Sequence, residues 1–349
     1  MVKLFLLIFV VSLSVAALLY VFKNTITDRI VNPVAKEKTI FEKPLAKYSF
    51  ERLRIAKVSA GSITLGDVVK KDEEFTSYMF YFHDGDKKVS GLLNLPREEE
   101  TFPVIVMFRG FVEREQFTSG EGTRRTAEEF ARNGFITLAP DFLGYGESDM
   151  PSEKSIEERF QTYTTALSIM SSVQTLNQVI SKNDTITQKA DINKIGIWAH
   201  SNGGQIALSI LAITGKPIPT VLWAPVSKPF PYNILYFTDE FDDEGKALRK
   251  VVADFERDYD VYNYSVTKYL SWINAPLQLN QGSADEAVPQ RWSDQFDALL
   301  TEKEIKHEYF IYPGENHNFN NGSWPLAVLR SIDFYRSTFS KPTSTPTSE

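Results

Sequence analysis

Cysteine is absent from this chain of 349 residues, and histidine is scarce, occurring only four times. Without cysteine the protein can form neither a disulfide bond nor a metal site with thiolate ligands. A basic stripe is missing as well, and the net charge of −7 at pH 7 argues against nucleic acid as a partner. The lack of cysteine fits both reducing and oxidising compartments, so it does not decide where the protein resides.

The residues that are abundant suit one compact domain. Hydrophobic residues make up 42% and aromatic residues 13% of the chain, which is enough for a single large core. We see no internal repeat, and therefore expect one folded domain over residues 47–339.

The two ends of the chain differ from this domain. Residues 4–22 form an uncharged apolar run of nineteen residues, long enough to span a bilayer. We predict a transmembrane anchor at 1–23 and a polar stem at 24–46, which would make this a single-pass membrane protein with its folded domain outside the cytoplasm. The alternative is a signal peptide cleaved near Ala16, which would release a secreted protein. The Ser-, Thr- and Pro-rich residues 340–349 are predicted to be disordered.

Strand-like apolar runs alternate with helical patterns through the middle of the chain, which predicts a mainly parallel sheet flanked by helices. Residues 49–96 are expected to add antiparallel lead-in strands, paired around Asp84-Gly85. The predicted strands are 76–82, 88–95, 102–108, 135–141, 194–198, 220–224 and two that begin at Leu277 and His307, and the predicted helices are 126–133 and one or two within 155–181.

Ser201 lies where a strand-like run meets a helix-like run, in the segment Trp198-Ala199-His200-Ser201-Asn202-Gly203-Gly204. A serine on a tight strand-to-helix turn is a nucleophile elbow, whose strained backbone exposes the hydroxyl. Glycines fit at 203 and 204 because side chains there would collide with the returning helix, and Ala199 replaces the usual first glycine. The alternative interpretation is a serine that only caps the helix.

An acid and a histidine follow two later strands. Asp285 comes after the strand that begins at Leu277, and His317 comes after the strand that begins at His307. Both lie past the carboxyl end of a strand, where open parallel sheets place their active sites. In this arrangement His317 would take a proton from Ser201, and Asp285 would fix the imidazole tautomer and stabilise the imidazolium.

Each assignment has a competitor. Glu286 is the alternative acid, and Asp285 is preferred because it stands three residues before Val288-Pro289. His200 is adjacent to the nucleophile, so its side chain is expected to point away. His83, in a predicted hairpin turn, and His307 are read as structural or solvent-facing.

From Lys47 to Phe339 the chain resembles an α/β-hydrolase, and more narrowly the catalytic domain of the prolyl oligopeptidase family, with dienelactone hydrolase-type esterases as near relatives. The residues that carry the resemblance are Ser201-Asn202-Gly203-Gly204, Ala139-Pro140-Asp141 with Gly144-Tyr145-Gly146-Glu147-Ser148, Gly282-Ser283-Ala284-Asp285 with Val288-Pro289, and Pro313-Gly314-Glu315-Asn316-His317. The chain departs from the family in two ways. It has no room for a β-propeller before the domain, and Arg109 stands where many relatives have histidine.

The resemblance implies a serine hydrolase that forms an acyl-enzyme and needs no cofactor. Peptide substrates are the first expectation and carboxylic esters the second, with the backbone amides of Asn202 and Phe111 as the oxyanion hole. A catalytically inactive membrane-tethered interaction module is a remote alternative. The sequence does not indicate the oligomeric state.

Residues 226–273 interrupt the strand–helix alternation and are predicted to form a helical cap over the site. Their acidic cluster has no glutamate at the twelfth position of a calcium loop, so we interpret it as a solvated face rather than a metal site. The segment Gly144-Tyr145-Gly146 lacks the third glycine of a dinucleotide-binding turn, which argues against such a cofactor.

Deleting residues 1–23 tests the predicted anchor. The full chain is expected to remain with membranes through a carbonate wash, because a helix over 4–22 would bury its apolar side chains in hydrocarbon. The shortened chain is expected in the soluble fraction, measured by immunoblot. A soluble mature protein that begins near Leu18 would instead indicate a cleaved signal.

Overall fold

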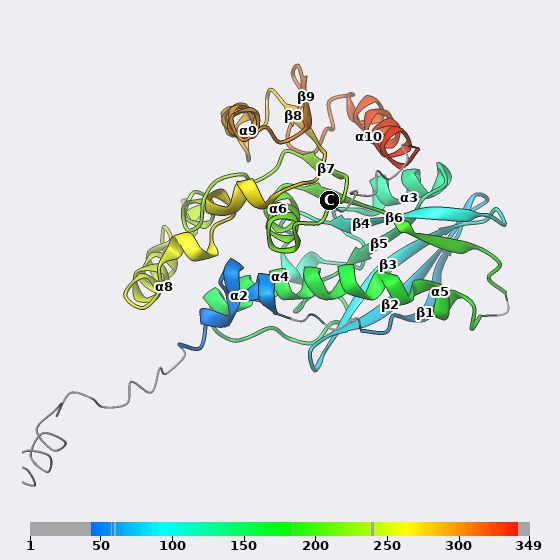
Figure 1. The fold of residues 1–349 in the computed structure, drawn as a ribbon, viewed down its shortest axis with the longest axis horizontal. Helices are drawn as coiled ribbons and strands as arrows, with labels where there is room; N and C mark the ends of the chain where they lie inside the picture. The colour runs from blue at the N-terminus through cyan, green and yellow to red at the C-terminus, as the bar shows by residue number, and fades with distance from the viewer. Residues whose placement is uncertain (1–42, 57, 59–60, 184, 239–240, 341–349) are drawn as a thin grey trace, which may run out of the picture. The chain divides into compact units, whose positions relative to one another are not determined.

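The computed structural model describes residues 43–56, 58, 61–183, 185–238 and 241–340 (Figure 1). A compact unit begins at Leu45. None of the helices in these residues is both long and apolar enough to cross a membrane. The anchor predicted at 1–23, most of the stem at 24–46 and residues 341–349 of the predicted tail lie outside the described residues.

Within the described residues, nine strands form one sheet in the order β1-β2-β3-β5-β4-β6-β7-β8-β9. The first three pair antiparallel, β3 pairs antiparallel with β5, and the neighbours from β5 to β9 are parallel. The predicted parallel sheet with antiparallel lead-in strands is therefore confirmed. The strands are β1 Thr64–Lys71, β2 Phe75–Asp84, β3 Lys87–Pro96, β4 Thr101–Phe108, β5 Ile136–Pro140, β6 Lys189–His200, β7 Thr220–Trp223, β8 Leu277–Gly282 and β9 His307–Tyr312.

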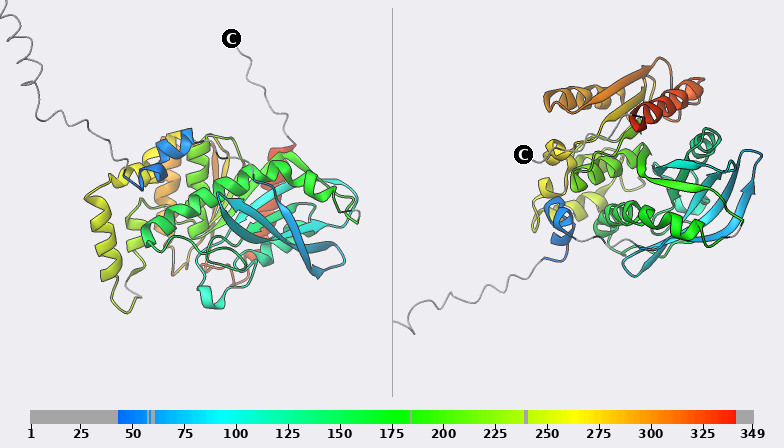
Figure 2. Two further views of the ribbon diagram at one scale, coloured as in Figure 1. Left: turned by 90° about the horizontal axis from the view of Figure 1, so that it is seen from below. Right: turned by 45° about the vertical axis from the view of Figure 1, so that its right-hand side comes forward.

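Helices cover both faces of the sheet (Figures 1 and 2). Alternate residues of β4 explain why, since Val104 and Val106 join a core cluster with α4 and α6, whereas Ile105 and Met107 join a second cluster with α3 and α10. The helices are α2 Phe50–Ile55, α3 Arg124–Arg132, α4 Ser155–Ser172, α5 Leu176–Ile180, α6 Asn202–Thr214, α7 Tyr232–Leu235, α8 Lys246–Glu256, α9 Gln290–Glu302 and α10 Trp324–Phe339, with short 3-10 turns at Ala46–Tyr48, Arg114–Gln116, Val173–Thr175, Val261–Tyr264 and Val266–Trp272.

Several boundaries differ from the prediction. Residues 50–55 form helix α2 instead of a lead-in strand, because Ser49 accepts a hydrogen bond from the Arg52 amide and caps a helix that buries Phe50 and Leu53. Strand β6 begins at Lys189, earlier than predicted, because Thr101 and Phe102 of β4 pair with its first residues. His83 lies within β2, opposite Lys88, instead of in the turn.

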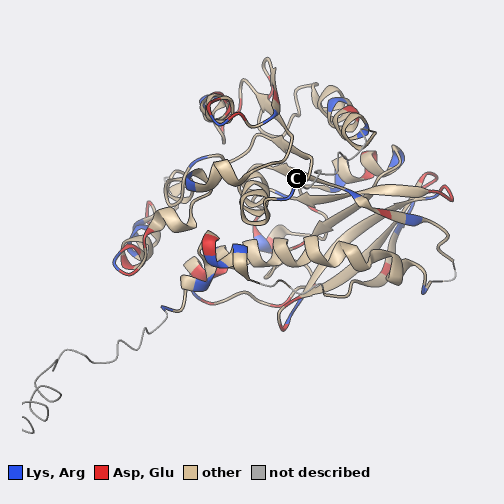
Figure 3. Ribbon diagram, in the orientation of Figure 1, with Lys and Arg blue, Asp and Glu red and all other residues tan. Residues whose placement is uncertain are grey.

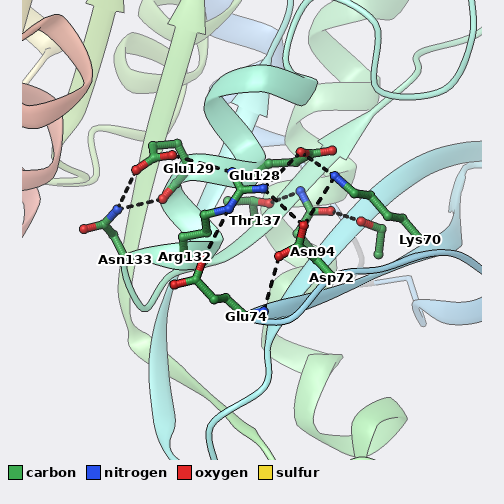
Figure 4. A network of polar contacts seen from close by, with 10 residues as sticks. Lys70, Asp72, Glu74, Asn94, Glu128, Glu129, Arg132, Asn133 and Thr137 are labelled. Carbon is green, nitrogen blue, oxygen red and sulfur yellow. Dashed lines mark hydrogen bonds and ion pairs between the residues drawn. The ribbon is translucent and has the colours of Figure 1, made fainter. Parts of the chain in front are cut away.

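A polar network ties the lead-in strands to α3 (Figure 4). Arg132 of α3 forms ion pairs with Asp72 at 3.2 Å and Glu74 at 3.4 Å, while Lys70 pairs with Glu128 at 2.7 Å. The network therefore holds α3, whose first turn lies near the candidate site, against the edge of the sheet.

Charges of both signs are dispersed over helices and loops, and the central strands are largely uncharged (Figure 3).

Helix α6 can approach β4 closely because residue 203 is glycine. A Cβ atom added at Gly203 would lie 2.1 Å from the carbonyl oxygen of Phe108, and one at Gly204 would lie 2.6 Å from Cβ of Pro225. The side chains that the sequence excludes at these positions would thus collide with β4 and with the segment after β7.

The variant Gly203→Ala tests this close approach. We expect it to lose about 2 kcal/mol or more of unfolding free energy, because the methyl group overlaps backbone that cannot rotate away. Urea unfolding of both proteins provides the measurement. Gly85→Ala is the control, since its φ of 63° is strained but its Cβ meets no atom, and it is expected to cost about 1 kcal/mol. Equal costs for the two variants would contradict the steric argument.

Candidate active site

Ser201 joins β6 to α6 in a strained conformation. Its φ of 55° and ψ of −121° are unfavourable for a residue with a side chain. The strain is held by two backbone hydrogen bonds of 3.0 Å, one from the Ser201 amide to the Trp223 carbonyl and one from the Val226 amide to the Ser201 carbonyl. The neighbouring strand β7 therefore fixes the turn that the sequence predicts as the nucleophile elbow.

Asp285 and His317 are brought together by the loops after β8 and β9. Nδ1 of His317 lies 3.0 Å from Oδ1 and 2.9 Å from Oδ2 of Asp285. Because an ionised carboxylate only accepts hydrogen bonds, Nδ1 carries the proton and Nε2 is free to accept one. This is the tautomer that a general base needs. Glu286, the competing acid, is exposed to solvent.

A set of donors fixes the carboxylate of Asp285. Oδ1 accepts hydrogen bonds from the amides of Ala287 at 3.0 Å and Val288 at 2.7 Å, and Oδ2 accepts one from Gln281 Nε2 at 3.0 Å. Gln281 is in turn oriented by Ser293, whose hydroxyl donates to its Oε1 at 2.7 Å. Gln281 was not predicted from the sequence. The amide side chains that alternate with leucines in β8, Gln278, Asn280 and Gln281, were the signal that could have identified it.

His200 contacts the candidate base instead of pointing away as expected. Its Nε2 lies 2.9 Å from the backbone carbonyl oxygen of His317, and the two rings are 4.6 Å apart. Burial, together with the nearby His317 ring, lowers the pKa of His200 to about 3. The ring is therefore neutral near pH 7, and its Nε2–H donates to the carbonyl and positions the loop that carries His317.

Glu315 organises the same loop from the inside. Its buried carboxylate accepts hydrogen bonds from the amides of Asn321 at 2.6 Å, Ser323 at 2.7 Å and Asn316 at 3.2 Å. Burial alone would raise the pKa of this carboxyl, but the three amides hold the pKa below its ordinary value. The loop is thus built around a negative charge.

The segment after β4 passes beside Ser201. A Cβ atom added at Gly110 would lie 3.0 Å from Cβ and 3.5 Å from Oγ of Ser201, so a side chain there would crowd the hydroxyl. Asn202 is the first residue of α6, where backbone amides and the helix dipole favour negative charge. The amides of Asn202 and Phe111 remain the predicted oxyanion hole, and the Phe111 side chain is exposed.

Arg109, whose role the sequence left open, is a buried support for this segment. Its guanidinium donates to the carbonyl oxygens of Gly110 at 2.8 Å and Asp141 at 3.1 Å, and lies 3.9 Å from the centre of the Tyr145 ring. Burial lowers the pKa of Arg109. Burial also raises the pKa of Asp141, whose carboxylate accepts hydrogen bonds from Ser90 and Ser119.

A pocket of about 240 Å³, called here the first pocket, opens beside Asn202 and Phe111. Ile234 and Leu248, from the segment between β7 and β8, contribute to its wall. Arg159 also lines it, donating to Asn202 Oδ1 at 3.2 Å, while its Nε has no partner. Burial lowers the pKa of Arg159, and no carboxylate in the described part of the chain pairs with it.

The remaining candidates have structural surroundings. His307 bridges Asp297 at 2.9 Å and the Ile305 carbonyl at 2.7 Å, as expected of a structural histidine. In the described ranges, no group of three or more His, Asp or Glu side chains is arranged to hold a metal ion.

Comparisons with known proteins identify the fold. A family model described as the alpha/beta hydrolase fold matches residues 103–259. The chain has the α/β-hydrolase fold. The matched segment includes Ser201 and ends before Asp285 and His317.

Proteins of similar sequence include a peptidase and a putative carboxymethylenebutenolidase. The chain is 26% identical over 136 residues to dipeptidyl peptidase family member 6 of Caenorhabditis elegans, a match to 37% of the chain and only 18% of the nematode protein. It is 24% identical over 219 residues to the putative carboxymethylenebutenolidase of Escherichia coli strain K12, covering 62% of the chain and 68% of that relative.

Solved structures with a similar fold also include both an esterase and a peptidase. The acetyl xylan esterase from Paenibacillus sp. R4 superposes with a TM-score of 0.54 at 15% identity, over 82% of this chain and 92% of the esterase. The acylaminoacyl peptidase of Pyrococcus horikoshii gives a TM-score of 0.52 at 18% identity, over 77% of this chain and 42% of the peptidase. Fold and neighbours together support a hydrolase.

The pKa of Glu315 generates a prediction on stability. The pKa of the Glu315 carboxyl is lower in the folded state than in the unfolded state. The contribution of Glu315 to the unfolding free energy is therefore fully present above the unfolded-state pKa, and it is lost as the pH falls through the folded-state pKa. Glu315→Gln is therefore expected to cost about 1–3 kcal/mol at pH 7, and the cost should shrink in acid below the ordinary glutamate pKa of 4.5. Thermal unfolding across pH measures this, with the exposed Glu308→Gln as control. A cost that does not change with pH would contradict the assignment.

Proposed function

We propose that this chain is a serine hydrolase that cleaves an acyl bond through a covalent acyl-enzyme on Ser201, Asp285 and His317. The single observation that carries the proposal is the Asp285–His317 contact, which engages Nδ1 of His317 and leaves its Nε2 available to act as a general base. A helix cap would need neither the strain nor the buried acid–histidine pair. The same features argue against an inactive interaction module.

In the proposed reaction, Oγ of Ser201 attacks the substrate carbonyl while Nε2 of His317 takes its proton. Asp285 stabilises the imidazolium, and the amides of Asn202 and Phe111 stabilise the oxyanion. His317 then returns the proton to the leaving group, which departs and leaves Ser201 acylated. Water, deprotonated by His317, attacks the acyl-enzyme and releases the acid product.

Two substrate classes are compatible with this site. A peptide or amide bond is the first candidate, and the nematode peptidase among the relatives supports it. A carboxylic ester is the second, favoured by the fact that the chain spans nearly all of the Paenibacillus esterase and less than half of the Pyrococcus peptidase. The unpaired Arg159 guanidinium in the first pocket suits an acyl part that carries a carbonyl or carboxylate oxygen.

The segment between β7 and β8 is proposed to act as the predicted cap. Ile234 of α7 and Leu248 of α8 line the first pocket, so these helices would limit the size of the acyl part. The assignment of residues 47–339 as the catalytic domain and of 1–23 as the anchor that exports it is proposed on the same basis as in the sequence analysis.

Ser201→Ala tests the proposed nucleophile. Labelling by a fluorophosphonate probe is expected to disappear, and turnover to fall roughly 10⁴-fold or more, with unchanged circular dichroism. Asp285→Asn should also be severely impaired, whereas the matched control Glu286→Gln should retain activity. A screen of aminoacyl amides against acyl esters determines the substrate class. Near-native activity of Ser201→Ala would refute the proposal.

A further inference from the structure

A second pocket, of about 450 Å³, lies at the same edge of the sheet as the candidate site. Its wall includes His200 and Trp223, the last residues of β6 and β7, and Asn318, which follows His317. Helix α3, which follows β4, contributes its first turn. The pocket is thus assembled from segments that follow parallel strands, the position at which α/β sheets bind ligands.

The two pockets flank Ser201 along the chain. Asn202 lines the first pocket, whereas His200 lines the second. His200 also holds the carbonyl of His317, so the second pocket adjoins the group that would protonate the leaving group. An enzyme that transfers an acyl group needs separate space for the acyl part and for the part that departs.

A buried donor in the second pocket lacks a partner. Trp198 is 2% exposed and lines this pocket, and its indole N–H has no acceptor within the described residues. The neighbouring Trp223 shows the contrast, since its indole N–H donates to the Ser331 hydroxyl at 3.2 Å. Buried polar groups without partners are uncommon, and each needs an explanation such as a bound water, an ion or an acceptor on a ligand.

Positive charge gathers at the same pocket. The first turn of the nine-residue helix α3 lines it, and Thr123 before that turn donates its hydroxyl to the Gly120 carbonyl instead of capping a helix amide. Arg125 lies 3.9 Å over the Trp324 ring and forms no ion pair in the described part of the chain. Arg124 donates to the Ser119 carbonyl at 2.6 Å.

Two acidic residues also line the wall. Glu128 is engaged by Lys70 at 2.7 Å and Arg132 at 3.6 Å (Figure 4), while Glu121 is exposed, as Arg124 and Arg125 are. The surplus of donors suits a carboxylate, and the rings of Trp198, Trp223 and Trp324 suit a flat apolar body attached to it.

We propose that the second pocket is the leaving-group subsite and binds a leaving group that carries a carboxylate. The assignment to the leaving group rests on the proposed function, whereas the binding of a carboxylate at this pocket does not. An amino acid or a hydroxy acid released from the acyl bond has the required chemistry.

Calorimetry tests the pocket without turnover, with benzoate and benzamide as probes of the full chain. Benzoate is expected to bind at least tenfold more tightly than benzamide, and Arg125→Gln to remove about a tenfold advantage. Arg257→Gln, which removes an exposed arginine on the far end of α8, is the matched control and should change nothing. Equal affinities of the two probes, or an unaffected Arg125→Gln, would overturn the proposal.

Hydrolysis tests the leaving-group role. Two esters share the acyl group preferred in the substrate screen and differ in the leaving group, which is 4-hydroxybenzoate in one and its methyl ester in the other. The wild-type chain is expected to favour the free carboxylate about tenfold in kcat/KM, and Arg125→Gln to abolish this preference. Benzoate binding without the kinetic preference would overturn the leaving-group role. Failure of fluorophosphonate labelling would refute the proposed function alone, since calorimetry still decides the pocket.

Discussion

The buried carboxylate of Asp285 organises the candidate site, because its neighbours supply the hydrogen bonds that fix it. Its side chain is fully buried and receives donors from its own loop, from Gln281 and from His317. A buried charge without such partners would cost several kcal/mol. Orienting His317 is thus inseparable from satisfying Asp285, and the loops after β8 and β9 must fold against each other for either to be stable.

Two buried residues that line the pockets keep polar groups that the protein does not satisfy. Arg159 and the indole of Trp198 keep polar atoms without protein partners, and burial lowers the pKa of Arg159. Such groups reduce the stability of the free protein, whereas a ligand that supplies an acceptor recovers the loss on binding. The hydrogen bonds of the groups that position Asp285 and His317 are therefore satisfied within the protein, whereas Arg159 and Trp198, which line the pockets, each keep an unsatisfied donor.

The features that the sequence predicted are those encoded locally. Buried strands such as β4 and β7 show as short apolar runs, and the turn at Ser201 shows because its close contacts require adjacent glycines. Asp285 and His317 follow strand ends, where topology alone gathers them. Features that depend on distant pairs were not predictable, since the contact between His200 and His317 joins residues 117 positions apart. The packing of Arg109 on Tyr145 likewise has no local pattern.

The backbone at Ser201 lies between residues that line the two pockets. At the candidate nucleophile, the tripeptide His200-Ser201-Asn202 links the two pockets, and its strained centre is held by β7. His200 faces the second pocket and the His317 loop, while Asn202 faces Arg159 and the first pocket. A rigid tripeptide keeps both walls at a fixed offset from Oγ of Ser201. A substrate that fills both pockets would therefore be positioned by rigid backbone, which is the condition for converting binding energy into correct orientation of the reacting bond.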